Sequence, residues 1–252
     1  MSKSISQIRQ EFDGADEKSG EELCRLYAGD ARAGVQNLIA RYRRRQDALK
    51  KERARLDEMM FYEKKYSGYE RICGIDEAGR GPLAGPVVAG AVILPKDCEI
   101  LGVNDSKKLS AKKRELLYDE IMEKAVAVSV GIVSPQRIDE INILQATYEA
   151  MREAAAGLGT EPDILLNDAV TIPEVIIPQV PIVKGDAKSV SIAAASIIAK
   201  VTRDRIMVEY ESRFPGYGFA SNKGYGSAEH IEALRRLGPS PIHRNSFIGN
   251  FI

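Results

Sequence analysis

The sequence predicts an α/β fold: a mixed β-sheet with flanking helices, a small helical extension at the N-terminus and a helical region at the C-terminus. Three patterns support this fold class. Apolar residues at helical spacing run through residues 1–60. Two apolar runs at residues 72–75 and 86–94, joined by a turn rich in Gly and Pro, predict an antiparallel hairpin. Later apolar runs alternate with helical patterns, which is typical of parallel strands connected by helices.

The first 60 residues are predicted to form helices separated by Gly14, Gly20, Gly29 and Gly34. Residues 41–55 carry eight Lys and Arg against two acids, the densest basic run of the chain. On a helix these residues could contact a nucleic-acid backbone, although a solvated helix face would have the same composition.

The polar residues 62–70 indicate a linker. We therefore expect residues 1–65 to form a helical, nucleic-acid-binding accessory extension. Residues 70–252 are expected to form the main domain, including the C-terminal helices.

The main domain begins with a predicted strand that ends in Asp76 and Glu77. Fold stability does not require two acids there, and buried unpaired carboxylates are costly, so such acids usually bind a metal or a cation. Gly79, Arg80 and Gly81 follow. Glycines let the backbone approach a ligand closely, and a guanidinium pairs with phosphate. This stretch predicts a metal site beside a phosphate-binding loop.

Helices and strands alternate after the hairpin. Ser110 is the predicted N-cap of a helix that reaches Lys124, and residues 125–133 form a third predicted strand. A helical turn begins at Ser134 and Pro135, and a helix covers residues 143–158. Two more helices are predicted at residues 189–214, where alanines would allow close approach to the sheet, and at residues 228–237. In the helix between Ser110 and Lys124, four residues are expected to face the core: Leu116, Leu117, Ile121 and Met122.

Two later predicted strands also end in acids, one at Asp168 and one at Asp186. Neighbouring strands lie ~4.8 Å apart, so these acids can converge with Asp76 at one end of the sheet. Adjacent residues of a regular strand point to opposite faces, and we therefore expect a distortion near Ala78 that brings Glu77 round. Asp186 precedes a helix and could alternatively be its cap.

The composition limits the chemistry. The chain has two histidines and three widely spaced cysteines, which argues against a zinc site and a disulfide framework and favours reduced thiols in the cytoplasm. The polar N-terminus and the absence of an apolar run of ~18 residues predict neither secretion nor a membrane span. Four carboxylates alone match Mg²⁺ or Mn²⁺, and two such ions can activate water and stabilise a leaving oxygen in phosphodiester cleavage.

The charge distribution fits a polyanion as the ligand. Residues 71–183 carry 11 Lys and Arg against 17 Asp and Glu, a net charge of −6. The flanking residues 1–70 and 184–252 have net charges of +2 and +4. An acidic centre between basic surfaces is suited to gripping nucleic acid, although segments of this length also vary by chance.

The motifs of the main domain together resemble ribonuclease HII. The resemblance covers residues 70–247, and the Gly-Arg-Gly turn favours this group over ribonuclease HIII. The helical extension resembles one found in some bacterial members. The matching segments are Asp76–Pro86, Asp105–Leu109, Gly185–Ser189, Ile192–Lys200, Arg203-Asp204, Lys223–Gly226 and His243-Arg244.

This resemblance implies a ribonuclease H-like fold and a metal-dependent endoribonuclease. Such an enzyme cuts the RNA strand of RNA–DNA hybrids and the bond 5′ to single ribonucleotides in duplex DNA, leaving 3′-hydroxyl and 5′-phosphate ends. The activity belongs to ribonucleotide excision repair. Asp76, Glu77, Asp168 and Asp186 would be the catalytic metal ligands, holding Mn²⁺ or Mg²⁺, with two ions present during catalysis.

The resemblance also implies a substrate-binding set. The glycine turn would sense the ribose 2′-hydroxyl through its backbone, since this hydroxyl distinguishes RNA from DNA. A tyrosine would pack on the sugar at the RNA–DNA junction, and two lysines would contact phosphates. These residues are Gly79, Arg80, Gly81, Tyr225, Lys107 and Lys188.

The expected partners are RNA–DNA hybrid and ribonucleotide-containing DNA duplex, bound by a cytoplasmic monomer. Two alternatives remain: a related two-metal nuclease acting on other nucleic acid, and a non-catalytic nucleic-acid-binding protein. Asn167 stands where the family usually has an apolar strand residue, and we expect it to make a polar contact away from the site. Residues 247–252 are expected to pack or to be disordered rather than to bind a partner.

Overall fold

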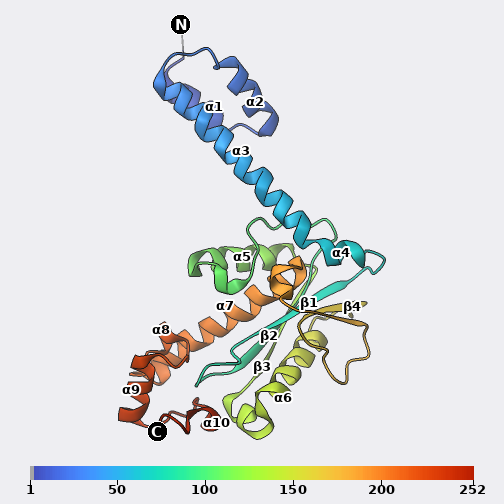
Figure 1. Cartoon of the computed structure of the whole chain (residues 1–252), viewed down its shortest axis with the longest axis vertical. Coiled ribbons are helices and arrows are strands. Elements are labelled where there is room, and N and C mark those ends of the chain that lie inside the picture. Colours follow the sequence, from blue (N-terminus) through green and yellow to red (C-terminus); the bar gives the residue numbers. More distant parts are fainter. Residues whose placement is uncertain (1–2) are drawn as a thin grey trace. The chain divides into compact units, whose positions relative to one another are not determined.

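The computed structural model describes residues 3–252 and has the predicted fold class, a helical N-terminal part followed by a mixed sheet with helices (Figure 1). The chain divides into two compact units, one ending at Asp57 and one comprising Glu58–Ile252. In the described residues, no helix combines the length and the apolar character that crossing a membrane requires.

The first unit is built from α1 (Ile5–Asp13), α2 (Glu17–Leu26) and most of α3 (Ala33–Met59). Their apolar faces share a small core in which the rings of Phe12 and Tyr42 lie 5.5 Å apart between centroids. Gly20 and Gly34 lie inside α2 and α3, so the prediction that they separate helices was wrong.

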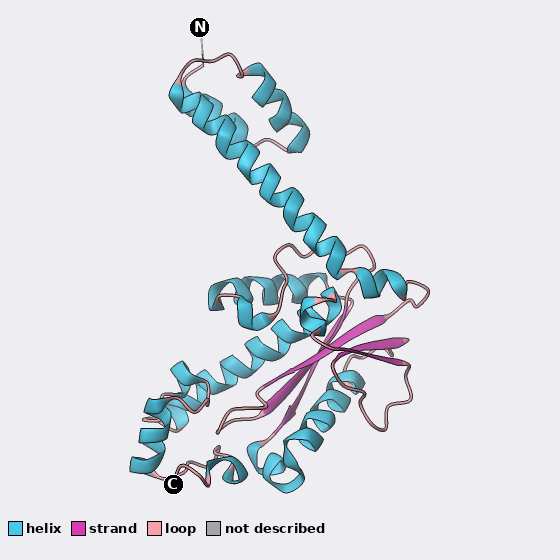
Figure 2. Cartoon of the chain, in the orientation of Figure 1, coloured by secondary structure: helices cyan, strands magenta, loops and turns pink. Residues whose placement is uncertain are grey.

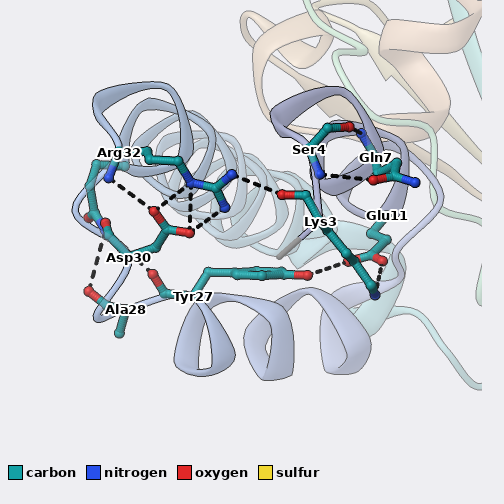
Figure 3. Close-up of polar contacts among 9 residues, drawn as sticks. Lys3, Ser4, Gln7, Glu11, Tyr27, Ala28, Asp30 and Arg32 are labelled. Carbon is teal, nitrogen blue, oxygen red and sulfur yellow. Dashed lines mark hydrogen bonds and ion pairs between the residues drawn. The ribbon is translucent and has the colours of Figure 1, made fainter. Parts of the chain in front are cut away.

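Figure 3 shows the polar contacts that close this unit. The Tyr27 hydroxyl donates to Glu11 at 2.9 Å, and the Arg32 guanidinium holds Asp30 and donates to the Lys3 carbonyl at 2.8 Å. The hydrogen bonds from Arg32 lower the pKa of Asp30 to about 2. The loop before α3 is therefore tied to the start of α1.

A five-stranded sheet forms the centre of the second unit, in the order β3-β2-β1-β4-β5 (Figure 2). The strands β1, β2 and β3 are antiparallel, as the hairpin prediction required, whereas β4 and β5 run parallel to β1. Their bounds are β1 (Ile72–Ala78), β2 (Val87–Ile93), β3 (Ala127–Val133), β4 (Ile164–Asp168) and β5 (Gln179–Ile182).

The fifth strand ends earlier than predicted. It stops at Ile182, and Asp186 lies in the 3₁₀ turn η2 (Gly185–Ala187) instead of on a strand. Lys184 adopts a left-handed conformation with φ 58°, which no strand can continue through.

Two long helices cover the sheet. α6 (Pro135–Ala156) packs on one face, and its backbone breaks at Asn142 (φ 67°), so the predicted turn and helix are two separate segments. α7 (Val190–Arg213) lies against β1 and β2 on the other face. A Cβ at Gly74 or Gly90 would come within 2.1 Å or 2.5 Å of the α7 backbone, which confirms the predicted close approach of this helix.

The shorter helices surround this core. α4 (Phe61–Lys65) contacts the start of α7, where Glu63 accepts hydrogen bonds from the Ser189 hydroxyl at 2.6 Å and the Ser191 N–H at 2.9 Å. The remaining elements are the 3₁₀ turn η1 (Ser106–Lys108), α5 (Ala111–Lys124), α8 (Phe219–Asn222), α9 (Ala228–Leu237) and α10 (Asn245–Ile248).

The inward face of α5 is narrower than predicted. Leu117 and Ile121, four residues apart on one helix face, are buried. Leu116 and Met122 are 58% and 49% exposed, because they flank that face, and their predicted core positions were wrong.

Candidate active site

Two of the predicted acids lie level with each other at the ends of neighbouring strands. Ile75 on β1 is paired with Asn167 on the parallel β4, so Asp76 and Asp168 come next on the two strands. Residues level on adjacent strands share a face of the sheet, ~4.8 Å apart. Asp76 is buried, and Asp168 Oδ1 accepts a hydrogen bond from the Gly185 N–H at 2.7 Å.

Glu77 lies next to Asp76 on a regular part of β1. β1 stays paired with β2 through Ala78, which lies opposite Val88, so the predicted distortion near Ala78 was wrong. β4 ends at Asp168, and Ala169 adopts φ 57°, so among residues 3–252 no strand flanks this edge of β1 beyond Asp76. The open strand end leaves room for the longer Glu77 side chain, whose pKa responds to the charge of Asp168.

Burial and mutual repulsion raise the pKa values of this pair. For Asp76 the largest cause is burial, followed by the charges of Glu77 and Asp168. For Glu77 burial again raises the pKa, and the positive charge of Arg80 opposes the shift. The metal-free site therefore disfavours full ionisation of its acids.

Asp186 approaches the same cluster from η2. Burial raises its pKa to about 6, with further contributions from Asp105 and Asp168. It is not the cap of α7, because Ser189 accepts the capping hydrogen bond from the Ile192 N–H. The structure thus brings all four predicted acids into one electrostatic cluster.

Sequence reasoning missed Asp105 as a member of the cluster. It precedes η1, and its Oδ1 accepts a hydrogen bond from the Lys107 N–H at 2.9 Å. Its negative charge also raises the pKa of Asp186. A single acid inside an otherwise basic loop was the signal in the sequence.

The positive charge beside the acids comes from Arg80 and Lys107. Arg80 Nη1 lies 3.5 Å from Glu77 Oε1, and Lys107 lowers the pKa values of Glu77 and Asp186. Within residues 3–252, no three carboxylates, imidazoles or thiols are gathered closely enough to hold a metal unaided. The acids of the cluster offer oxygen donors alone, which is the ligand type that Mg²⁺ and Mn²⁺ prefer.

The two glycines of the turn have different surroundings. Gly79 has φ +97°, and a Cβ there would lie 2.1 Å from Arg203 Nε, so no other residue fits. A Cβ at Gly81 would meet nothing within 4 Å. Gly79 is therefore needed for the fold of the loop, whereas the backbone at Gly81 faces open space.

Two buried arginines hold this loop, and sequence reasoning gave them no role. Arg244 donates to the carbonyls of Gly79 at 2.6 Å, Arg80 at 2.9 Å and Gly85 at 2.8 and 3.0 Å. Burial, together with the nearby positive charge of Arg203, lowers the pKa of Arg244 to about 9. The guanidinium is satisfied by backbone carbonyls rather than by a carboxylate.

Arg203 connects the loop to the segment that carries Tyr225. It donates to the carbonyls of Ala84, Pro86 and Lys223 at 2.9–3.1 Å. Its guanidinium carbon lies 5.8 Å from the centroid of the Tyr225 ring, which is 43% exposed. Tyr225 is therefore fixed beside the loop with part of its ring free.

The two predicted lysines differ. Lys107 lies beside the acid cluster, as described above. Lys188 is exposed, and across the described part of the chain it forms no ion pair with any of the four acids. Only Lys107 is thus associated with the cluster.

The structure also bears on the expectations for Asn167 and for residues 247–252. The amide of Asn167 donates to Gln179 at 2.8 Å, confirming the expected polar contact. In the C-terminal segment, Ile248 is buried in a small apolar cluster with Leu83 and Leu234, and Phe251 packs against that cluster, so the expectation of packing is also confirmed.

These features define a nuclease with a ribonuclease H-like fold. Residues 73–250 match the family model described as Ribonuclease HII, and residues 4–67 match Ribonuclease HII N-terminal domain. The chain belongs to the ribonuclease HII family, and its activity is that of a ribonuclease HII, an endoribonuclease.

Known relatives match between two thirds and nearly all of this chain. The ribonuclease HII of Lachnoclostridium phytofermentans is 65% identical over 250 residues, which cover 99% of this chain and 98% of that protein. The crystal structure of ribonuclease H2 from Pyrococcus horikoshii is 32% identical with a TM-score of 0.59, covering 70% of this chain and 93% of that one. A structure of Bst-RNase HIII in complex with Mn²⁺ has a TM-score of 0.53 and 22% identity, covering 66% and 61%, and shows a likeness of fold alone.

Proposed function

We propose that this chain hydrolyses the RNA strand of RNA–DNA hybrids and the bond 5′ to a single ribonucleotide in duplex DNA. The products would carry 3′-hydroxyl and 5′-phosphate ends, as ribonucleotide excision repair requires. The observation that carries this proposal is the electrostatic interaction among Asp76, Glu77, Asp168 and Asp186, next to the Gly79–Gly81 loop.

The acids are proposed to be the metal ligands. Asp76, Glu77, Asp168 and Asp186 would hold Mg²⁺ or Mn²⁺, with two ions present during catalysis. A bound ion of this kind lowers the pKa of a water molecule and stabilises charge on the leaving oxygen. Positive charge at the site would also relieve the repulsion that raises the pKa values of Asp76 and Glu77.

The loop and Tyr225 are proposed to select the sugar. The open space beside Gly81 supports an approach of the ribose 2′-hydroxyl to the backbone, and the exposed part of the Tyr225 ring supports packing on the sugar at the RNA–DNA junction. Arg80, Lys107 and Lys188 would contact phosphates, with Arg80 exchanging its contact with Glu77 for the substrate.

We further propose that residues 1–65 form a nucleic-acid-binding accessory part and that residues 70–252 form the catalytic domain. In the basic run, Arg41 and Arg53 lie near Asp13 and Glu17 of the first unit, at 3.4 and 3.8 Å. Arg43, Arg44 and Arg45 are exposed, which supports a role in gripping a phosphate backbone.

The proposed setting is a cytoplasmic monomer. All three cysteines are free thiols, which supports a reducing compartment. The proposed partners are RNA–DNA hybrid and ribonucleotide-containing DNA duplex.

Cleavage mapping tests the proposal. Three labelled duplexes, one with a single ribonucleotide, one RNA–DNA hybrid and one of DNA alone, are incubated with Mg²⁺, with Mn²⁺ or with EDTA. We expect cutting of the first two only, 5′ to ribonucleotides and only with metal. Cutting of the all-DNA duplex would favour a related two-metal nuclease, and binding without metal-dependent products would favour a non-catalytic binding protein.

A further inference from the structure

The only two histidines of the sequence form a buried pair outside the acid cluster. His230 lies on α9 and His243 lies just before α10, and both are buried. Their Nε2 atoms are 3.0 Å apart. A direct contact between two imidazoles requires that one nitrogen donates and the other accepts.

The outer nitrogens of the pair determine the tautomers. The Ser240 N–H, which can only donate, lies 2.9 Å from His243 Nδ1, so this nitrogen is unprotonated. The Tyr225 carbonyl, which can only accept, lies 2.8 Å from His230 Nδ1, so this nitrogen carries a proton. The remaining proton therefore lies on His243 Nε2, which donates to His230 Nε2, and both rings are neutral.

The surroundings of the pair favour this neutral state. The rings of Tyr217 and Phe219 enclose it, with centroids 5.0–6.5 Å from those of the two imidazoles. Burial lowers the pKa values of both histidines, and that of His243 falls to about 4 with the charge of His230 as a further cause. Because these apolar surroundings disfavour a charged imidazole, both rings stay neutral, and the direction of the hydrogen bond between them stays fixed.

On one side the pair holds the backbone of Tyr225. The Tyr225 carbonyl accepts from His230, and the preceding Gly224 carbonyl accepts from the Leu83 N–H at 2.8 Å. The Tyr225 segment is thus fastened at two successive carbonyls, one to α9 and one to the chain that follows the glycine turn.

On the other side the pair is linked to the glycine turn itself. The backbones of His243 and Ala84 form an isolated β-bridge. The next residue, Arg244, donates hydrogen bonds to the carbonyls of Gly79 and Arg80. A continuous set of contacts therefore joins the Tyr225 carbonyl, the two imidazoles and the turn.

We propose that His230 and His243 are positioning residues that set the Tyr225 ring relative to the Gly79–Gly81 turn and thereby set the preference for a ribonucleotide-to-deoxyribonucleotide junction. This inference rests on the proposed function, in which Tyr225 packs on the junction sugar. Neither histidine touches the substrate in this arrangement, because both are buried behind the loop that carries Tyr225.

The tautomers are tested on the unmodified full-length protein. Because the chain has two histidines, a ¹⁵N-histidine sample gives two ring systems, and long-range ¹H–¹⁵N spectra at pH 7 separate protonated from unprotonated nitrogens. We expect one neutral ring protonated at Nδ1 and one at Nε2. Two rings of the same tautomer, or a charged ring, would overturn the proposal without any variant.

The positioning role is tested by single-turnover cleavage of two duplexes, one with a single ribonucleotide and one a continuous RNA–DNA hybrid. His230→Phe keeps an aromatic ring at this position and loses both hydrogen bonds. We expect the ratio of junction rate to hybrid rate to fall ~5- to 10-fold, the loss corresponding to about one buried hydrogen bond. His230→Asn retains a donor for the Tyr225 carbonyl and should recover most of that ratio.

Two further variants separate the possible outcomes. Tyr217→Phe removes a hydrogen bond to the Gly238 carbonyl in the same aromatic box and should leave the ratio unchanged. Tyr225→Ala should lower the ratio, and adding His230→Phe to it should have no further effect. An effect of Tyr225→Ala without one of His230→Phe overturns the positioning role alone, whereas no effect of Tyr225→Ala overturns the proposed role of Tyr225 as well.

Discussion

Replacing Arg244 with methionine should detach the glycine turn from the rest of the domain. The side chain keeps a similar length but loses every donor. Four hydrogen bonds to three backbone carbonyls disappear. The exposed Arg80 loses one of these partners, and two buried acceptors, the carbonyls of Gly79 and Gly85, lose the others. Each such acceptor costs about 1–3 kcal/mol.

The substitution also removes a buried charge, which offsets part of this cost. Burial disfavours the charged Arg244 guanidinium and lowers its pKa to about 9. We therefore expect a net loss of about 3–5 kcal/mol, the range typical of removing one partner from a buried charged contact. For a domain of this size that corresponds to a fall in Tm of roughly 6–20 °C. Arg244→Lys can keep one or two of the hydrogen bonds, so its stability should lie between that of Arg244→Met and that of the unchanged protein.

Thermal and urea unfolding measure this change, and cleavage of a single-ribonucleotide duplex reports on the loop. The matched control is Arg235→Met, because Arg235 is exposed and donates one hydrogen bond to the Phe251 carbonyl at 3.1 Å. That substitution should cost less than about 1 kcal/mol. Equal losses for the two variants would refute the assignment of Arg244 as the anchor of the turn.

Four further outcomes are expected. Asp76→Asn should abolish cleavage in Mg²⁺ while the circular dichroism spectrum and hybrid binding stay largely unchanged, and undiminished cutting would contradict its role as a ligand. Because the pKa of Asp186 is about 6 when folded against its ordinary 3.8, the folded state binds the proton more tightly, so metal-free stability should fall as pH rises from 4 to 6, by roughly 1 kcal/mol after solvent screening. Thermal unfolding in EDTA should show that fall, and Mg²⁺ at pH 8 should offset it. Asp186→Asn should reduce the fall without removing it, because the pKa values of Asp76 and Glu77 are also raised. Gly79→Ala should prevent correct loop formation, whereas Gly81→Ala should leave Tm within ~1 °C but slow cleavage, since its Cβ meets only open space; equal changes in Tm would argue against this division. Deleting residues 1–65 should weaken duplex binding and flatten its dependence on salt, and an unchanged affinity and salt slope would exclude a role in binding.

The sequence was sufficient for features that depend on local pattern. The alternation of apolar runs predicted the mixed sheet and its hairpin, and acids at strand ends predicted where the site would lie. Asp76 and Asp168 come together because of the parallel register of β1 and β4, which the general rule for α/β sheets anticipates.

The sequence was insufficient where long-range packing decides the outcome. The approach of Glu77 to the other acids depends on where β4 ends, at Asp168, which is distant along the chain. Local reasoning instead predicted a distortion near Ala78, which does not occur. Arg203 and Arg244 resemble ordinary basic residues in the sequence, because only the folded chain places their guanidinium groups under the turn. The need for glycine at position 79 is likewise visible only in the folded chain, where a Cβ would collide with the Arg203 side chain.

The anchoring of the turn by Arg244 has a consequence for protein synthesis. The turn is among the first parts of the second unit to leave the ribosome, whereas its anchor lies 165 residues later. A nascent chain that has not yet reached Arg244 has its acids but not a fixed turn beside them. Since domains fold as units, such a chain should remain inactive, and premature termination before this residue should yield no partly active fragment.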